Sequence, residues 1–324
     1  MTVMFGLRFD FRNPAFAGVP MADRYDAALE MAEWADRLGC VSLTVSEHHG
    51  SPDGYLPSPL PMLAAMAART TNVRLMVAAV IVPFYDPLRL AEDLIVLDHL
   101  SKGRVDVILA GGYVGEEFEM FGVPIGERAK RVTEAVETLR LAFSGEAFDF
   151  RGRTVRVTPS PYRDGGPALL LGGSSDAAAR RAARIADGFI PSIPSVWDAY
   201  RDECIKLGKA DPGPGMLPPA HTVALAADAD KGWQEHGPYF LHETNAYGKW
   251  IADSGTAGPY QEVADIEALR AMGEYSVVTP AQMVEDLKAA PFPFVMLHPM
   301  CGGTPPELAW SSLKLFETQV IDEL

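Results

Sequence analysis

The segment Val41-Ser42-Leu43-Thr44-Val45-Ser46-Glu47-His48-His49-Gly50 begins as an apolar strand pattern and ends abruptly in a carboxylate and two imidazoles. A helical pattern precedes it at residues 22–38, and another follows at residues 59–69. Strands that alternate with helices in this way predict a parallel sheet. The carboxyl ends of such strands carry the chemistry, so Glu47-His48-His49 is a candidate active-site edge.

The alternation continues on both sides of this segment. Strand patterns occur at residues 3–9, 41–46, 73–82, 104–110, 168–171, 188–191, 223–227 and 294–298. Eight strands, with no linker between them and no GxGxxG loop after the first, favour a closed (β/α)8 TIM barrel over a doubly wound sheet. We therefore expect residues 1–324 to form a single α/β barrel domain.

Two segments interrupt the regular pattern. Residues 147–157 predict a β-hairpin that lies outside the barrel. Residues 228–275, before the last strand, form a helical or loop insertion rich in large amphipathic side chains. This insertion is a candidate substrate lid, with Tyr247 and Trp250 as candidate substrate-binding residues. Aromatic side chains packed on the barrel wall would explain the same composition.

Composition excludes several classes of partner. The 28 basic and 43 acidic residues give a net charge of −15, which argues against a nucleic-acid or anionic-membrane surface. Cys40, Cys204 and Cys301 are far apart and odd in number, which favours a reducing compartment. The chain starts without a signal-peptide pattern, and no apolar run is long enough to span a bilayer. These features predict a cytoplasmic protein with no membrane contact.

The histidine pair is the leading catalytic candidate, with Glu47 beside it. Imidazole titrates near neutral pH, which suits proton transfer. Because side chains alternate along a strand, only one of His48 and His49 is expected to face the barrel axis. Two histidines that merely bond loop carbonyls remain an alternative. We expect no metal site, since HExxH is absent and no Cys or Asp stands at ligand spacing.

Two glycine-containing strand ends are candidate cofactor-binding loops. Gly172-Gly173-Ser174-Ser175 leads from a strand into a helix, where free amides, the helix dipole and hydroxyls stabilise a phosphate. Helix capping by Ser175 is compatible with that role. Gly111-Gly112-Tyr113 ends the fourth strand and lets a ligand approach the backbone. Glu116, Glu117 and Glu119, which follow, are interpreted as a solvated helix start.

A third candidate is Ala78-Ala79 on the third strand, where small side chains let a flat ring lie against the backbone. Taken in order, these segments resemble the bacterial luciferase-like monooxygenase family along nearly the whole chain. The matching motifs are Glu47-His48-His49, Ala78-Ala79, Asp86-Pro87, Ser101-Lys102-Gly103-Arg104, Glu117-Phe118, Phe121-Gly122 and Gly172-Gly173-Ser174-Ser175.

The resemblance implies an FMN-dependent monooxygenase. It implies that reduced FMN from a separate flavin reductase reacts with O2, and that a flavin peroxide then oxidises a small organic substrate. His48 matches the family's active-site histidine, thought to act as a base. Ala78-Ala79 matches the site of a non-prolyl cis peptide against the isoalloxazine ring, and Ser174-Ser175 matches the flavin phosphate site.

The resemblance also implies a homodimer, with the apolar helix at residues 59–68 at the interface. One departure concerns the phosphate. Where luciferase has an arginine after the fourth strand, this chain has Gly111, so another cation must substitute. Arg8 and Arg180 are the alternatives that we considered.

Two other functions remain open. A deazaflavin-dependent oxidoreductase of the same superfamily would transfer hydride without O2, but that branch more often carries Asp-His than Glu-His-His at this position. A non-catalytic flavin-binding protein would need no active-site histidine, and the presence of His48 argues against it.

Overall fold

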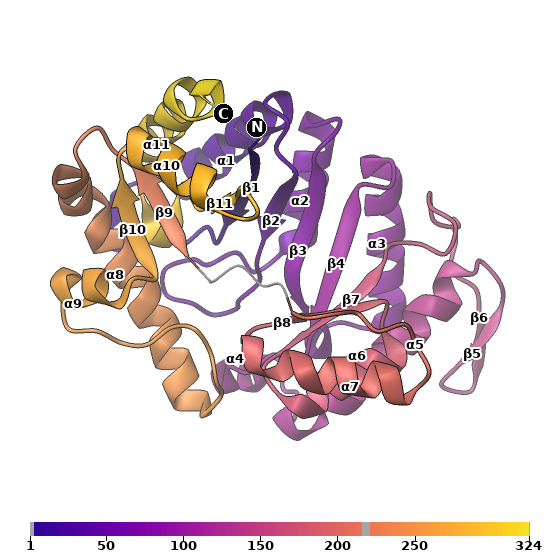
Figure 1. The fold of residues 1–324 in the computed structure, drawn as a ribbon. Helices are drawn as coiled ribbons and strands as arrows, with labels where there is room; N and C mark the ends of the chain where they lie inside the picture. The colour runs from indigo at the N-terminus through magenta and orange to yellow at the C-terminus, as the bar shows by residue number, and fades with distance from the viewer. Residues whose placement is uncertain (1–2, 216–220, 324) are drawn as a thin grey trace.

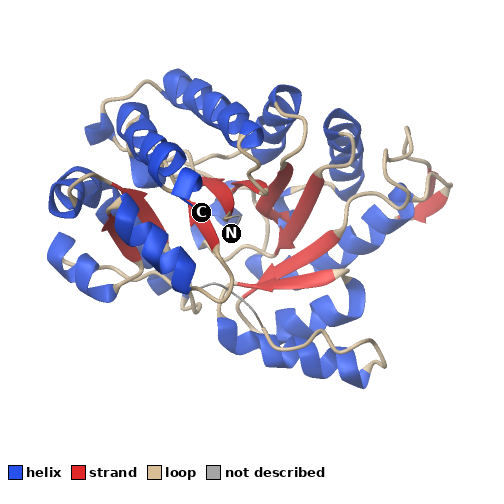
Figure 2. Cartoon of the chain, turned by 45° about the horizontal axis from the view of Figure 1, so that its top comes forward, coloured by secondary structure: helices blue, strands red, loops and turns tan. Residues whose placement is uncertain are grey.

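The computed structural model describes residues 3–215 and 221–323. Its centre is a parallel sheet in the strand order β10-β9-β11-β1-β2-β3-β4-β7-β8. The strands are β1 (Met4–Phe9), β2 (Ser42–Val45), β3 (Arg74–Ile81), β4 (Val105–Ala110), β7 (Leu169–Gly173), β8 (Gly188–Pro191), β9 (Thr222–Leu225), β10 (Tyr275–Val278) and β11 (Phe294–Leu297). Helices surround the sheet, as Figures 1 and 2 show.

The helices alternate with the strands as the sequence predicts. They are α1 (Met21–Arg37), α2 (Pro59–Arg69), α3 (Pro87–Ser101), α4 (Gly115–Met120), α5 (Arg128–Phe143), α6 (Asp176–Ile185), α7 (Trp197–Lys206), α8 (Ala229–Ser254), α9 (Ile266–Met272), α10 (Pro280–Ala289) and α11 (Pro306–Gln319). Side chains cap several of their starts. Asp86, for example, accepts hydrogen bonds from the amides of Leu88 and Arg89 at the start of α3.

The expectation of eight strands is wrong by one, because the sheet contains nine. The additional strand, β10, lies at the end of the predicted insertion and pairs with β9. The predicted insertion, residues 228–275, overlaps this strand at Tyr275, because a four-residue strand is too short to show clear alternation. β8 and β10 are the two ends of the strand order, and no ladder joins them in the described residues. The predicted insertion therefore consists of α8, α9 and the start of β10.

Alternation along each strand separates the core from the site. On β1 and β2, Leu7, Phe9, Leu43 and Val45 are fully buried in the hydrophobic core. Burial of each such side chain contributes roughly 1.5–3 kcal/mol. The residues between them point to the opposite face, where the strands end around a cavity. Because side chains alternate along a strand, burial of the apolar residues in the core turns the residues between them toward the cavity.

The predicted hairpin is formed by β5 (Phe148–Phe150) and β6 (Arg153–Val155), which pair antiparallel. Figure 1 shows it at the outer edge of the molecule, away from the central sheet. Among the described residues, no helix has the length and apolar character that crossing a bilayer requires. All three cysteines are buried, unpaired thiols.

Candidate functional site

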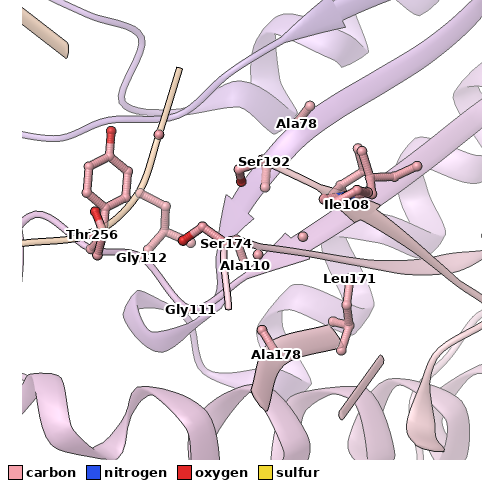
Figure 3. A pocket seen from close by; sticks show the side chains of 18 of the residues that line it. Ala78, Ile108, Ala110, Gly111, Gly112, Leu171, Ser174, Ala178, Ser192 and Thr256 are labelled. Atoms are coloured by element: carbon pink, nitrogen blue, oxygen red, sulfur yellow. The ribbon is translucent and has the colours of Figure 1, made fainter. Parts of the chain in front are cut away.

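A cavity of about 620 Å³ lies where the central strands end. Its wall combines the ends of β1 to β4, β7 and β8 with one face of α8 and the loop at residues 256–260. Figure 3 shows Ala78 on β3, Ala110 on β4 and Ser174 after β7 around this space. Segments far apart in the sequence thus converge on one site.

The cavity contains nearly all of the residues expected from the sequence. Those that line it are Glu47, His48, Ala78, Ala79, Gly111, Gly112, Tyr113, Gly172, Gly173, Ser174, Ser175 and Tyr247. Trp250 does not line the cavity. Its ring instead stacks on the imidazole of His48, with ring centroids 4.3 Å apart. Trp250 is therefore placed behind His48, where it supports the histidine from the α8 side.

His48 is held by the carboxylate of Glu117, a residue that the sequence pattern assigns to a solvated helix start. Its Nδ1 lies 2.7 Å from Oε1 of Glu117, and the same oxygen accepts the amide hydrogen of His49 at 2.9 Å. Glu117 is 1% exposed, so its interpretation as part of a solvated helix start is wrong. α4 turns this residue inward beside Phe118, while Glu116 and Glu119 remain exposed. The signal available in the sequence was the helical periodicity of α4, which places Glu117 on its inner face and Glu116 and Glu119 on its outer face.

Glu47 and His49 form a second pair. Glu47 Oε1 lies 2.7 Å from His49 Nε2 and accepts the Tyr85 hydroxyl at 3.1 Å. Its Oε2 accepts the amide hydrogen of Ile81 at 3.1 Å. The His49 ring packs against aromatic side chains outside the cavity lining. β2 ends at Val45, before the pair, so strand alternation does not decide the outcome; His48 lines the cavity, and His49 lies outside its lining.

An aromatic group behind His48 surrounds a buried cation that sequence reasoning missed. The guanidinium carbon of Arg12 lies 4.7–4.8 Å from the ring centroids of Tyr55, Tyr247 and Trp250. Burial disfavours the charged form, but the surrounding tyrosines and acidic groups outweigh it and raise the pKa of Arg12. Cation–π contacts of this kind favour one arrangement of the rings. Arg12 therefore attaches α8 to the end of β1.

Two polar contacts reinforce this attachment of α8. Asp53 accepts from Arg12 Nη1 at 2.5 Å and lies 2.8 Å from Nε2 of His242. The Tyr55 and Tyr247 hydroxyls lie 2.7 Å apart. The inner face of α8 is thus a fixed part of the cavity wall.

The third strand carries the backbone feature that the resemblance implied. The peptide between Ala78 and Ala79 is cis, although neither residue is proline. The β3–β4 pairing shifts register between Ala78 and Val80. Both alanines line the cavity, so backbone and small side chains form this part of its wall.

The loop after β7 has the geometry of an anion site. Ser175 caps α6 and accepts from the amide of Ala178 at 3.3 Å. A Cβ at Gly173 would lie only 2.6 Å from the Cβ of Ala178, so a side chain at position 173 would occupy the space between the loop and the start of α6. The start of α6 adds the positive end of its dipole.

Two arginines other than the expected Arg8 and Arg180 line the same cavity. Arg128 and Arg181 line the cavity, and no salt bridge to either is found in the described part of the chain. The side chain of Arg128 passes Gly111 at 3.8 Å from where its Cβ would stand. Arg180 lies outside the lining and pairs with Asp176. Arg128 on α5 and Arg181 on α6, which have no distinguishing sequence pattern, are therefore the candidates for the cation that the departure at Gly111 requires.

Arg8 lines the cavity on the side of β1, away from the serine loop in the strand order. It donates to the Tyr260 hydroxyl at 3.0 Å and to Glu243 Oε1 at 3.1 Å. Burial works against its charge, yet Tyr260 and Glu243 raise the pKa of Arg8. Arg8 is therefore a permanent cation that faces a different part of the cavity from Arg128.

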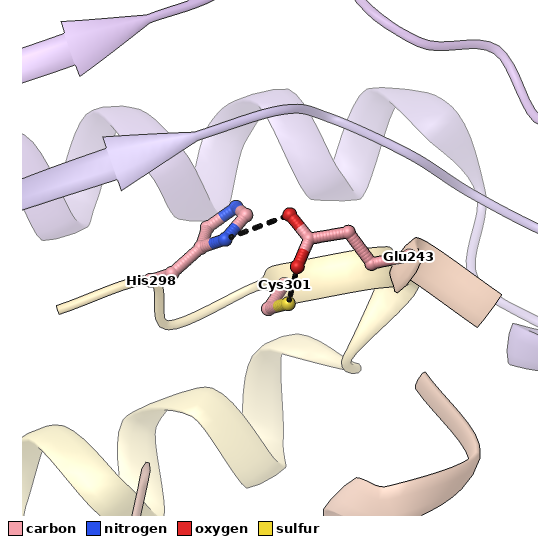
Figure 4. A group of neighbouring side chains, drawn as sticks. All are labelled: Glu243, His298 and Cys301. Carbon is pink, nitrogen blue, oxygen red and sulfur yellow. Dashed lines mark hydrogen bonds and ion pairs between the residues drawn. The ribbon is translucent and has the colours of Figure 1, made fainter. Parts of the chain in front are cut away.

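Behind Arg8 lies a fully buried group formed by Glu243, His298 and Cys301, with their ligand-type atoms within 4.8 Å of one another. Figure 4 shows the imidazole of His298 and the thiol of Cys301 directed at the Glu243 carboxylate. Burial opposes the charged imidazolium, but the carboxylates of Asp10 and Glu243 raise the pKa of His298. Burial and the same carboxylates raise the pKa of the Cys301 thiol. His298 therefore lies between the carboxylates of Asp10 and Glu243.

Comparison with known proteins bears on the identity of the chain. A family model described as luciferase-like monooxygenase matches residues 4–289. The y4wF protein of Sinorhizobium fredii is 29% identical over 73% of this chain and 72% of its own length. The oxygenase component of the flavin-dependent trigonelline monooxygenase of Acinetobacter baylyi is 30% identical, over 45% of this chain and only 42% of its own length.

Solved structures extend the likeness over the whole chain. Monooxygenase RslO1 from Streptomyces bottropensis is 25% identical with a TM-score of 0.74, covering 98% of this chain and 99% of its own. The FMN complex of the oxygenating constituent of 3,6-diketocamphane monooxygenase from Pseudomonas putida is 19% identical, with a TM-score of 0.74 and coverages of 100% and 99%. An F420-dependent secondary alcohol dehydrogenase is 16% identical, with a TM-score of 0.70 and coverage of 98% of each chain.

The last two likenesses show the fold alone, and together with RslO1 they confirm the predicted barrel class. The family model covers most of the chain, including the histidine segment, the cis peptide and the glycine–serine loop. The chain is therefore an enzyme that belongs to the luciferase-like monooxygenase family.

Proposed function

We propose that this enzyme is an FMN-dependent monooxygenase that uses O2 and reduced flavin from a separate reductase to oxidise a small organic substrate. The observation that carries the proposal is the content of one cavity. The Gly172–Ser175 loop lies at the end of β7, Arg128 and Arg181 line the same cavity, and His48, paired with Glu117, follows β2. A phosphate-bearing ring cofactor is the ligand that such an arrangement fits.

The residues present fit flavin mononucleotide. Gly173 leaves a cradle that a Cβ would fill, and Arg128 and Arg181 supply positive charge in a chain of net charge −15. The small side chains of Ala78 and Ala79 leave room for a flat ring between this loop and His48. When bound, the reduced flavin supplies two electrons, so that one atom of O2 is transferred to the substrate and the other leaves as water.

The protein's own contribution is to position one proton-transfer group and to exclude water. Because the carboxylate of Glu117 accepts hydrogen bonds, it holds the hydrogen of His48 on Nδ1 and leaves Nε2 to accept or deliver a proton. Trp250 and Tyr55 pack against the ring and fix its orientation. The loop at residues 256–260 covers the cavity from the α8 side. Closure of this loop would exclude water.

In this proposal Glu47 is a positioning residue. Both of its oxygens are occupied, by His49, Tyr85 and the amide of Ile81. The separate reductase is supported by the relative that is itself named an oxygenase component. A homodimer through α2 remains part of the proposal. Gel filtration with light scattering tests it, and a monomer at micromolar concentration would contradict it.

Anaerobic titration with reduced FMN and with reduced deazaflavin tests the cofactor. The Gly–Ser loop favours the compact phosphate of FMN, whereas the fold alone is shared with an F420-dependent enzyme. We expect tight binding of reduced FMN. Tight binding of deazaflavin with no binding of FMN would instead establish a hydride-transfer enzyme.

Glu117→Gln tests the proposed proton-transfer pair. Stopped-flow reoxidation of bound reduced FMN by O2 needs no knowledge of the substrate, and turnover is then measured with aldehydes, ketones and sulfur compounds. We expect the kcat of substrate oxidation to fall by about 100-fold or more, with FMN affinity nearly unchanged. Glu116→Gln, an exposed neighbour on the same helix, is the matched control. Equal behaviour of the two variants would refute the role of Glu117.

A further inference from the structure

The cavity has a second polar region, distinct from the anion loop. Arg8 on β1 and Thr44 on β2 are register partners on adjacent strands, and both line the cavity. In the strand order they lie on the far side of β3 from the β7 loop. A flavin with its phosphate at Ser174 and its ring at Ala78 would leave this region open.

Thr44 is the first reason to assign a ligand to this region. Its side chain is 7% exposed, and its Oγ1 is buried without a hydrogen-bond partner in the described part of the chain. A buried hydroxyl without a partner costs about 1–3 kcal/mol, so such groups are uncommon away from binding sites. On β2 the apolar neighbours Leu43 and Val45 face the core, which directs Thr44 toward the cavity.

Arg8 is the second, independent reason. Its side chain is 22% exposed, whereas its partner Glu243 is completely buried. The Glu243 oxygens also accept from Tyr275 and Cys301, so the carboxylate is held in place. A guanidinium has five N–H donors. Arg8 donates three bonds, to Tyr260, Glu243 and Tyr247. Two of the five donors of Arg8 therefore have no partner in the described part of the chain.

The chemistry of these groups defines the ligand class. Arg8 can only donate, so its partner must be a hydrogen-bond acceptor. Arg8 is already paired with the Glu243 carboxylate, so an added carboxylate on the substrate would lie close to a second anion. A neutral oxygen fits better. We propose that Arg8 and Thr44 form a subsite for the carbonyl oxygen of a neutral organic substrate.

This subsite rests on the proposed function for its place in the reaction, because it sets the substrate carbonyl beside His48. Tyr55 and Tyr247 connect the two regions, with ring centroids 4.9 and 5.8 Å from that of His48. The flavin also carries carbonyl oxygens, so the experiment must separate substrate from cofactor. Binding of carbonyl compounds can be measured without any flavin.

Thr44→Val is the decisive variant. Valine keeps the shape of threonine and removes only the unpartnered hydroxyl, so the free energy of unfolding should stay equal or rise. The probes are two matched pairs, 1-tetralone with tetralin and 2-heptanone with heptane, titrated by calorimetry into protein with and without oxidised FMN. We expect the variant to weaken ketone binding about 3- to 10-fold, with hydrocarbon binding unchanged.

Two further variants complete the test. Arg8→Lys keeps the charge opposite Glu243 and loses the fork of donors, so it should also weaken the ketones selectively. Thr70→Val removes a buried hydroxyl that is bonded to Met66 and Arg104, and should lower stability without changing ketone binding.

Four outcomes would overturn the subsite. The first is equal ketone binding by wild type and Thr44→Val, and the second is a loss of hydrocarbon binding as large as the loss of ketone binding. The third is failure of either ketone to bind. The fourth is a selective loss of FMN affinity in the variant, which would assign Thr44 to a flavin carbonyl. Absence of FMN binding by the wild type would refute the proposed function alone, since the ketone comparison stands in the flavin-free protein.

Discussion

The clearest pH prediction concerns His236, a buried histidine on α8 that plays no part in the proposed chemistry. Its ring is 2% exposed and stacks on Phe240, and its Nδ1 has no partner within the residues described. Burial lowers the pKa of His236 from 6.5 to about 4. The imidazole is therefore neutral in the folded protein, whereas the unfolded chain binds a proton below about pH 6.5.

The magnitude follows from this difference. Between pH 6.5 and 4 the unfolded state holds more protons, so the free energy of unfolding falls as the pH falls. The full difference of 2.5 units corresponds to about 3 kcal/mol, and about 2 kcal/mol of it is already lost at about pH 5. Carboxylates with lowered pKa, such as Asp53, lose their contribution mainly at more acidic pH.

The assay is urea unfolding at about pH 7.5, 6 and 5, with wild type and His236→Leu compared at each pH. The difference between the two proteins isolates the histidine from other titrating groups, including Lys231 and Glu235 nearby. We expect the variant to gain about 2 kcal/mol relative to wild type on going from pH 7.5 to pH 5. His99→Leu, which removes an exposed imidazole, is the matched control. A difference that does not change with pH would refute a neutral, buried His236.

Three further predictions concern the cofactor loop and the fold. Arg128→Ala and Arg181→Ala should each raise the Kd for FMN about tenfold or more while leaving riboflavin binding nearly unchanged, measured by quenching of flavin fluorescence; equal losses for both flavins would argue against phosphate contacts. Gly173→Ala places a Cβ 2.6 Å from that of Ala178, so it should lower the free energy of unfolding by about 1–3 kcal/mol and weaken FMN binding. Thermal unfolding with and without FMN measures both effects. An unchanged unfolding temperature of the FMN-bound variant would show that the loop tolerates a side chain. Arg104→Met removes bonds to carbonyls at the end of α2 and should cost about 2–4 kcal/mol in urea unfolding, and a loss below about 1 kcal/mol would contradict this capping role.

The sequence was most informative where a local pattern and a strand end coincide. His48 and the Gly172–Ser175 loop follow apolar strands directly, so their place at the cavity follows from the fold class alone. The implied cis peptide at Ala78-Ala79 is present as well. In each case the chemistry and its position are encoded within a few neighbouring residues.

The missed residues depend on contacts between distant segments. Glu117 stands among other glutamates, and only the packing of α4 against the β2 loop separates it from them. Arg12 is buried because α8, more than 200 residues later, covers it. Arg128 and Arg181 resemble any surface arginine until the packing of α5 and α6 brings them to the cavity wall. Such placement is a property of tertiary packing, which local propensity does not specify.

The attachment of α8 through Arg12 and Asp53 has a consequence for how this scaffold can diversify. The strands that hold the anion loop, β3 to β8, contribute nothing to that attachment, whose groups lie on the segments after β1 and β2. An exchange of α8 together with those two segments would therefore transplant one wall of the cavity as a unit. The segment after β2 also carries His48, so such an exchange would have to keep its bond to Glu117 on α4.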